Sequence, residues 1–231
     1  MSAGMSSTST TTIRRMKIIL LYVVPNIISF SVVALLYKKL HPQWLRLFIF
    51  FLFITLIEST GSFLYSHYMK KSNHFIENIY LLVAFSFYFL LFYKSAEINK
   101  FKQLVVVFFS VYILFALADM IFINGLFYFN TYSSGLGSIL IILSSLLYFM
   151  RLFTSEKVMN YFRIPMFWIA TGLLFFFTGS LVQNSLIRYF IANHIDPNGS
   201  LYYFIMVTLN IFLHSAFIIS FLCNQVWKKV R

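Results

Sequence analysis

The sequence lacks the residues that several common chemistries require. Cysteine occurs once, at Cys223, so no disulfide can form within the chain. No glycine-rich phosphate loop follows a strand pattern and no Gly-x-Ser-x-Gly turn occurs, which argues against a P-loop nucleotide site and a serine hydrolase. The last apolar segment has no lysine that could hold retinal. Functional inference therefore depends on composition and on where polar residues fall.

Apolar residues dominate what is present. Of the 231 residues, 60% are hydrophobic, including 30 Phe and 15 Tyr, and the mean hydropathy is +0.83. A soluble domain of this size needs a more polar surface. A helix needs roughly 20 mostly apolar residues to cross a bilayer, and seven segments meet this length. We therefore predict an all-α polytopic membrane protein, a seven-helix bundle with spans over 18–37, 45–68, 75–93, 103–127, 137–153, 166–190 and 201–223.

This prediction divides the chain into three parts. Residues 1–16 are rich in Ser and Thr and are expected to be disordered. Residues 17–225 form the single transmembrane domain, and residues 226–231 a short basic cytoplasmic tail. Only eight residues follow Cys223, which predicts that any output domain is a separate protein.

Lys and Arg are distributed unevenly between the two sides of the predicted spans. One side carries twelve, three in each of four segments, and the other carries six. The positive-inside rule then predicts that the N-terminus is outside and the C-terminus is cytoplasmic. Trp44, Trp168 and Trp227 all fall at the cytoplasmic interface in this orientation. The net charge of +12 is thus explained by topology, and no soluble basic surface is left for nucleic acid.

Polar residues inside the spans are the strongest indication of function, because burying them in hydrocarbon is costly. Most fall in the outer halves of their helices, whereas the inner halves contain mainly Phe, Leu, Ile and Val. We therefore predict a polar pocket that opens outward above an apolar cytoplasmic half. The candidate pocket residues are Asn26, Glu58, Glu77, Asn78, Asp119, Gln183, Asn184, Asn210 and His214.

The same residues fit a simpler role as hydrogen-bonding groups that hold helices together, each contributing on the order of 0.6 kcal/mol. This alternative stays open for the amides. Glu58 and Asp119 favour function more strongly, because their charged forms cost more to bury. His67, His74 and His194 fall near the outer rim without the ligand spacing of a metal site, so neither a metal nor another cofactor is expected.

The second half of the chain resembles a group of short, uncharacterised seven-helix bacterial membrane proteins, often encoded near sensor histidine kinases. The resemblance rests on FNTYSSGLGSILIILSSLLYFMRLF, PMFWIATGLLFFFTGSL and TLNIFLHSAFIISFL, which begin at Phe129, Pro165 and Thr208. Phe129, Asn130, Pro165 to Trp168, Gly179, Leu209 and Asn210 match best, whereas Ser180 and His214 stand where the group more often has Asn. The resemblance implies a bacterial inner (cytoplasmic) membrane and a sensory context.

These observations favour an integral membrane receptor or accessory sensor in the lipid bilayer, which passes a signal to a separate protein such as a histidine kinase. One alternative is an intramembrane lipid-modifying enzyme with Glu58 and Asp119 as an acid/base pair. A small-solute carrier is the third. An enclosed outer pocket would favour the receptor, a lipid-filled groove the enzyme, and a continuous polar path the carrier.

Overall fold

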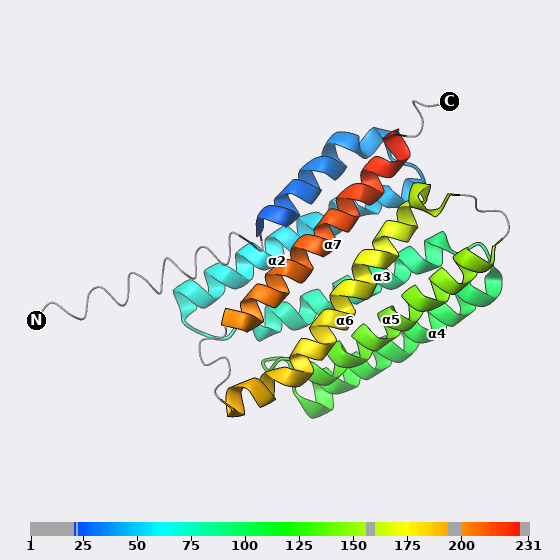
Figure 1. The fold of residues 1–231 in the computed structure, drawn as a ribbon. Coiled ribbons are helices and arrows are strands. Elements are labelled where there is room, and N and C mark those ends of the chain that lie inside the picture. The colour runs from blue at the N-terminus through cyan, green and yellow to red at the C-terminus, as the bar shows by residue number, and fades with distance from the viewer. Residues whose placement is uncertain (1–20, 22, 156–159, 194–199, 227–231) are drawn as a thin grey trace, which may run out of the picture.

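The computed structural model describes residues 21, 23–155, 160–193 and 200–226, which form a bundle of long helices without a strand (Figure 1). A helix over residues 23–36 comes first and is called the N-terminal helix below. The short 3₁₀ segments Tyr37–Lys39 and Gln43–Leu47 follow it. The longer helices are α2 (Phe48–Met69), α3 (His74–Ser95), α4 (Asn99–Ala118), α5 (Thr131–Thr154), α6 (Pro165–Ala192) and α7 (Ser200–Val226).

Six helices among the described residues are long and apolar enough to cross a membrane. They confirm the prediction of an all-α protein integral to a membrane. The first predicted span, residues 18–37, falls partly outside the described residues, so a seventh span stays a prediction. The segment 1–16, the side chain of His67, the residues His194 and Asp196, and the tail with Trp227 also lie outside what is described.

The helix ends on either side of one loop, between α4 and α5, differ from the predicted spans. The fourth span was predicted to reach Phe127, but α4 passes into a π-helical turn, Asp119–Ile123, and stops there. In that turn the carbonyl of Asp119 accepts the N–H groups of Asn124 and Gly125, at 2.9 and 3.4 Å. Gly125 then has φ +77°, a conformation that favours glycine and turns the chain out of the helix. Helix α5 begins at Thr131, six residues before the predicted start at residue 137.

Helix α3 lies at the centre of the bundle. It packs against α2, α4 and α5, and its Phe85 and Tyr88 reach Phe177 of α6, with ring centroids 5.2 and 5.7 Å apart. Phe48 at the start of α2 contacts Phe217 and Phe221 of α7, at 5.0 and 5.1 Å. Edge-to-face aromatic pairs contribute about 0.5–1.5 kcal/mol each beyond their burial. The many Phe residues of the sequence thus form a continuous core between distant helices.

Helices α6 and α7 approach each other closely. A Cβ atom at Gly172 would lie 2.8 Å from Cβ of Ala216, and one at Gly179 would lie 2.7 Å from Cδ2 of Leu209. Small residues at such positions let helix backbones come together in a membrane, where packing replaces the hydrophobic effect as the driving force. Glycine is needed for this close approach at Gly172, because the Cβ atom of Ala216 cannot move aside.

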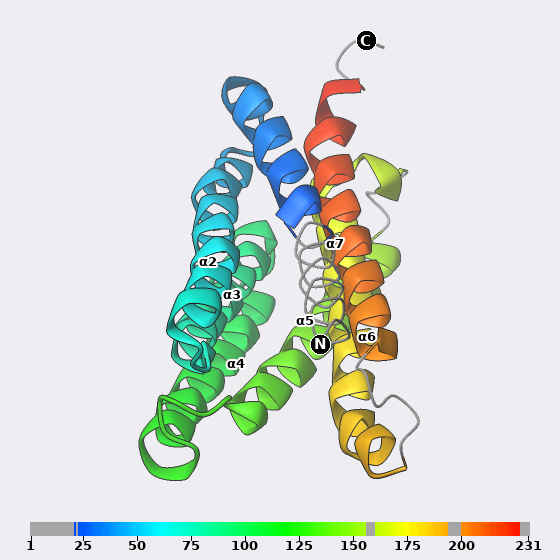
Figure 2. The same cartoon turned by 90° about the vertical axis from the view of Figure 1, so that its left-hand side faces the viewer.

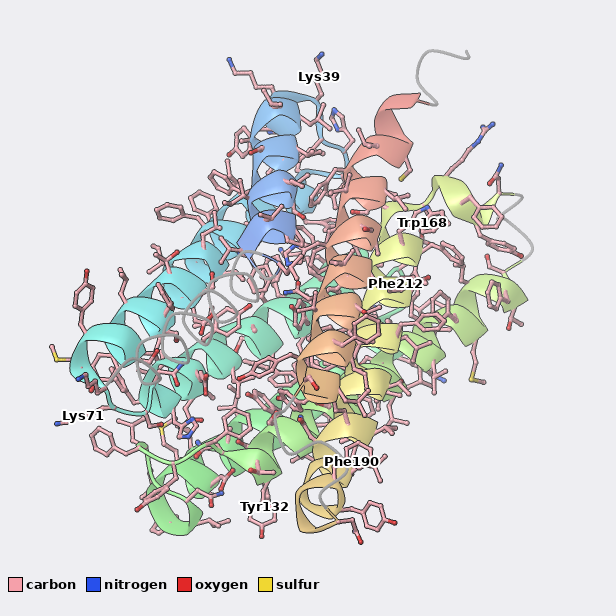
Figure 3. The ribbon with its side chains drawn as sticks, turned by 60° about the vertical axis from the view of Figure 1, so that its left-hand side comes forward. Lys39, Lys71, Tyr132, Trp168, Phe190 and Phe212 are labelled. Carbon is pink, nitrogen blue, oxygen red and sulfur yellow. The ribbon has the colours of Figure 1, made fainter. Side chains whose placement is uncertain are left out.

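The N-terminal helix lies beside α7, and the two helices run in the same direction (Figures 1 and 2). Lys39 and Trp168 lie at one end of the bundle, whereas Lys71, Tyr132 and Phe190 lie at the other (Figure 3). We call the first of these the basic end, because the Lys and Arg side chains around Lys39, Lys94 and Arg151 belong to the loops and helix ends that meet there.

Candidate functional site

A buried polar cluster lies between the N-terminal helix and α7. The hydroxyl of Ser29 is 2.9 Å from Nδ1 of His214 and donates to the carbonyl of Pro25 at 2.8 Å. A serine hydroxyl has one proton, so Nδ1 of His214 carries the proton that it donates to Ser29, and Nε2 is left as an acceptor. Ser29 is fully buried and His214 is 5% exposed. We call Asn26, Ser29 and His214 the Asn26 cluster.

Asn26 is the unusual member of this cluster. It is 2% exposed, yet neither its Nδ2 nor its Oδ1 has a hydrogen-bond partner in the part of the chain that the structure describes. Asn26 and Ser29 are three residues apart, a spacing that places them on one face of the N-terminal helix, toward α7. A buried donor and a buried acceptor are therefore available on the same side chain.

Asn210 extends this cluster along α7. It is half-buried and lies one turn before His214, as Asn26 lies one turn before Ser29. Because Ser29 is in contact with His214 and the two helices run in the same direction (Figure 2), Asn26 and Asn210, each about one turn earlier, lie at about the same level of the bundle. The structure thus brings three of the predicted site residues, Asn26, Asn210 and His214, to the contact between the first and last described helices.

A second group of polar side chains, around Asn78, makes complete sets of hydrogen bonds. The amide of Asn78 in α3 donates to the carbonyls of Leu126 and Tyr128, at 2.9 and 2.7 Å, and accepts the backbone N–H of Asn130 at 3.1 Å. In the orientation that satisfies its own side chain, Asn130 donates to the carbonyls of Gly125 and Tyr128, at 3.0 and 3.2 Å. Asn78 therefore fixes the backbone of the loop that joins α4 to α5.

Asp119 holds the other side of this loop. Its carboxylate accepts from Nδ2 of Asn124 at 2.7 Å and from the backbone N–H of Ser133, in the first turn of α5, at 2.9 Å. A carboxylate suits the positive N-terminal end of a helix. We call Asn78, Asp119, Asn124, Asn130 and Ser133 the loop network. Its contacts match the interhelical hydrogen-bonding role.

Glu58 and Glu77 bond locally. Glu58, on α2, accepts from the hydroxyl of Ser62 on the same helix at 3.0 Å and is half-buried. Glu77 accepts from Nδ2 of Asn73 at 2.9 Å and pairs with Nδ1 of His74 at 3.0 Å, in the first turn of α3. Such exposed pairs contribute little to stability. Helix α3 packs between α2 and α4, and no described contact joins the carboxylates of Glu58 and Asp119.

Gln183 and Asn184 differ although they are adjacent in α6. Gln183 is 4% exposed and donates from Nε2 to the carbonyl of Tyr202 in the first turn of α7, at 2.8 Å, while its buried Oε1 has no partner within the described part of the chain. Asn184 is exposed. Gln183 thus joins α6 to α7, and Asn184 faces away from the bundle.

The described cavity lies at the basic end, away from the predicted outer pocket. It has a volume of about 410 Å³ and lies where α3 and α5 end and where α4 and α6 begin. Lys94, Tyr148 and Arg151 contribute polar groups, and Trp44 and Met166 contribute apolar wall. Lys94 and Arg151 are two of the twelve Lys and Arg residues on the predicted cytoplasmic side, and the sequence predicted no role for them beyond topology. Ser29 was also missed, although its place one turn after Asn26 could have revealed it.

Comparison with known proteins gives no relative for this chain: no protein-family model, no curated protein and no solved structure matches it. The site is therefore interpreted from its own chemistry.

Proposed function

We propose that this protein is an integral membrane receptor or accessory sensor, and that the Asn26 cluster is where it recognises a small polar ligand. The ligand would lie between the N-terminal helix and α7, with Asn26 as donor and acceptor and Asn210 and His214 at its edge. A change in the contact between these two helices would be the signal passed to a separate membrane or cytoplasmic protein, such as a histidine kinase.

The amide of Asn26, for which the described residues offer no hydrogen-bond partner, carries this proposal. Leaving a buried polar group without a hydrogen bond costs about 1–3 kcal/mol, and most buried polar groups in native proteins are paired. Asn26 has two such atoms in a helix contact that apolar residues could fill. A ligand that offers both a donor and an acceptor, such as an amide or a hydroxyl compound, would satisfy both atoms at once.

The proposal includes the membrane arrangement. The N-terminal helix is the first of seven spans, the N-terminus is outside, and the basic end faces the cytoplasm. Support comes from the twelve-to-six distribution of Lys and Arg in the sequence. The likeness to short seven-helix bacterial proteins supports membership of that group and a place in the bacterial inner membrane. Cysteines introduced at Gly135 and Glu97 in a Cys223→Ser background test this orientation, because only the first should react with an impermeant thiol reagent in intact cells.

The ligand site is tested by mass spectrometry of small molecules that stay bound during purification in mild detergent. Wild-type protein and the Asn184→Leu variant should retain the same polar compound, because Asn184 is exposed. Asn26→Leu should lose that compound while keeping a wild-type melting temperature or a higher one. If all three proteins retain the same compounds, or if water alone occupies the site in an experimental structure of the wild type, the receptor proposal is wrong.

A further inference from the structure

The cavity at the basic end has the composition of a binding site. Its volume of about 410 Å³ falls in the range of roughly 300–1,000 Å³ that is typical of small-molecule pockets. Its apolar wall includes Pro42, Trp44, Ile164 and Met166. Its charged groups are Lys94, Arg151 and Glu97.

Arg151 is the group that most needs a ligand. Its guanidinium carbon lies 4.7 Å from the centre of the Phe101 ring, so one face of the cation is covered by a buried aromatic side chain. The nitrogen Nη1 is buried and has no hydrogen-bond partner among the described residues. A cation–π contact satisfies the face of a guanidinium but not the N–H groups in its plane. Arg151 lines the cavity, so an anion that enters it and displaces the atoms packed on Nη1 would supply the missing acceptor.

The other charged side chains that the structure describes near the cavity do not pair with Arg151. Within the described residues, no carboxylate lies within ion-pair distance of Arg151 or Lys94, and the ion pair that is present joins His74 and Glu77 elsewhere. Helix ends do not decide the sign of the field, because the N-termini of α4 and α6 and the C-termini of α3 and α5 all meet at this cavity. Among the described residues that line the cavity, two cations against Glu97 give a net positive charge.

We propose that this cavity binds a phosphate group, with Arg151 as the hydrogen-bonding fork and Lys94 as a second cation at the mouth. Arginine matches the oxygen geometry of phosphate, and lysine adds a point charge. The cavity is larger than one phosphate requires, and its wall is apolar, so the phosphate carries a further substituent. Basic pockets between membrane helices at the cytoplasmic side bind anionic lipid headgroups, and Trp44 in the cavity wall is a residue typical of that interface. This proposal does not depend on the Asn26 cluster.

The test measures stabilisation of the full-length protein in a neutral detergent. The probes are phosphatidylglycerol, phosphatidylcholine and inorganic phosphate, each titrated while the melting temperature is followed. Phosphatidylglycerol should raise the melting temperature of wild type, and Arg151→Gln should weaken its apparent affinity about ten-fold or more, because a hydrogen bond to a charged group is lost. Arg46→Gln is the matched control, since Arg46 lies at the same end over the Tyr37 ring without lining the cavity.

The two sources of phosphate give different results. If the natural ligand is a lipid headgroup, phosphatidylglycerol stabilises and inorganic phosphate does not. If it is a soluble phosphate compound, inorganic phosphate stabilises with the same dependence on Arg151. Equal responses from wild type, Arg151→Gln and Arg46→Gln, or no response to any probe, would overturn the proposal.

Two substitutions at exposed positions keep the test valid if Arg151→Gln does not fold. Lys94 and Glu97 are both exposed, so neither change should disturb the core. Lys94→Gln should weaken phosphatidylglycerol binding several-fold, whereas Glu97→Gln should strengthen it, because the opposing charge is removed. Opposite directions in these two variants support the site, and identical directions refute it.

Discussion

Asn78 and Asp119 of the loop network are as buried as Asn26, but the loop network and the Asn26 cluster differ in how completely these side chains are hydrogen-bonded. Asn78 and Asp119 are 2% and 0% exposed; the Asn78 amide has described partners for its NH₂ group and its oxygen, and each carboxylate oxygen of Asp119 accepts a described hydrogen bond. Asn26 is also 2% exposed, and its amide has no hydrogen-bond partner among the residues that the structure describes. Complete pairing explains Asn78 and Asp119 as structural groups. Incomplete pairing leaves Asn26 without a structural explanation, which is why we assign binding there.

The largest expected effect comes from breaking the loop network at Asn78. Asn78→Leu removes three hydrogen bonds and leaves the carbonyls of Leu126 and Tyr128 and the N–H of Asn130 without partners. We expect the free energy of unfolding to fall by about 2–4 kcal/mol, given that each orphaned group costs about 1–3 kcal/mol and that part of the loop can take up water. Unfolding in mixed SDS micelles measures this. If Asn78→Leu lowers the free energy of unfolding no more than Asn184→Leu does, the loop network does not stabilise the fold and the contrast with the Asn26 cluster fails.

A smaller loss is expected from Asp119→Asn. The amide keeps one acceptor oxygen but presents an NH₂ group either to the N–H of Ser133 or to Nδ2 of Asn124, and it removes the negative charge at the start of α5. The free energy of unfolding should fall by about 1.5–3 kcal/mol, the value of a hydrogen bond to a charged group. Should this variant keep wild-type stability and lose signalling instead, Asp119 would belong to a functional site.

The sequence could predict the spans better than the partners. Span existence depends on local composition, which is why six helices appear where apolar runs are found. The ends at Ile123 and Thr131 were misplaced because the turn between them is fixed by Asn78, about 50 residues earlier in the chain. Ser29 and His214 are 185 residues apart, and no spacing rule connects them. The positive-inside rule already accounted for Arg151 in the sequence, so nothing there indicated that this residue lines a cavity.

Ser29→Ala tests the paired half of the Asn26 cluster. It removes the acceptor for Nδ1 of His214 and should lower the free energy of unfolding by about 1 kcal/mol. His214→Leu should lower the free energy of unfolding by less, because the Ser29 hydroxyl keeps its hydrogen bond to the carbonyl of Pro25. The double variant should then be more stable than the sum of the two single losses predicts, as expected for residues in contact. Strict additivity would show that the two side chains do not interact.

The smallest expected effect on stability comes from Asn26→Leu, and this variant distinguishes the two regions most directly. Leucine has the same branched arrangement of four side-chain heavy atoms as asparagine but no polar atoms, so it removes two groups that have no partner among the described residues from a buried helix contact. Without ligand, the free energy of unfolding should stay within about 0.5 kcal/mol of wild type or rise, because replacing an unsatisfied polar group by an apolar one removes its desolvation penalty. Asn78→Leu is the same chemical change at the same exposure, and it should cost several times more. A loss of about 2 kcal/mol or more from Asn26→Leu would mean that Asn26 is paired in the native protein and belongs with the loop network as a structural residue. Stability near wild type, combined with loss of a bound polar compound, leaves ligand binding as the reason for a polar side chain at this position.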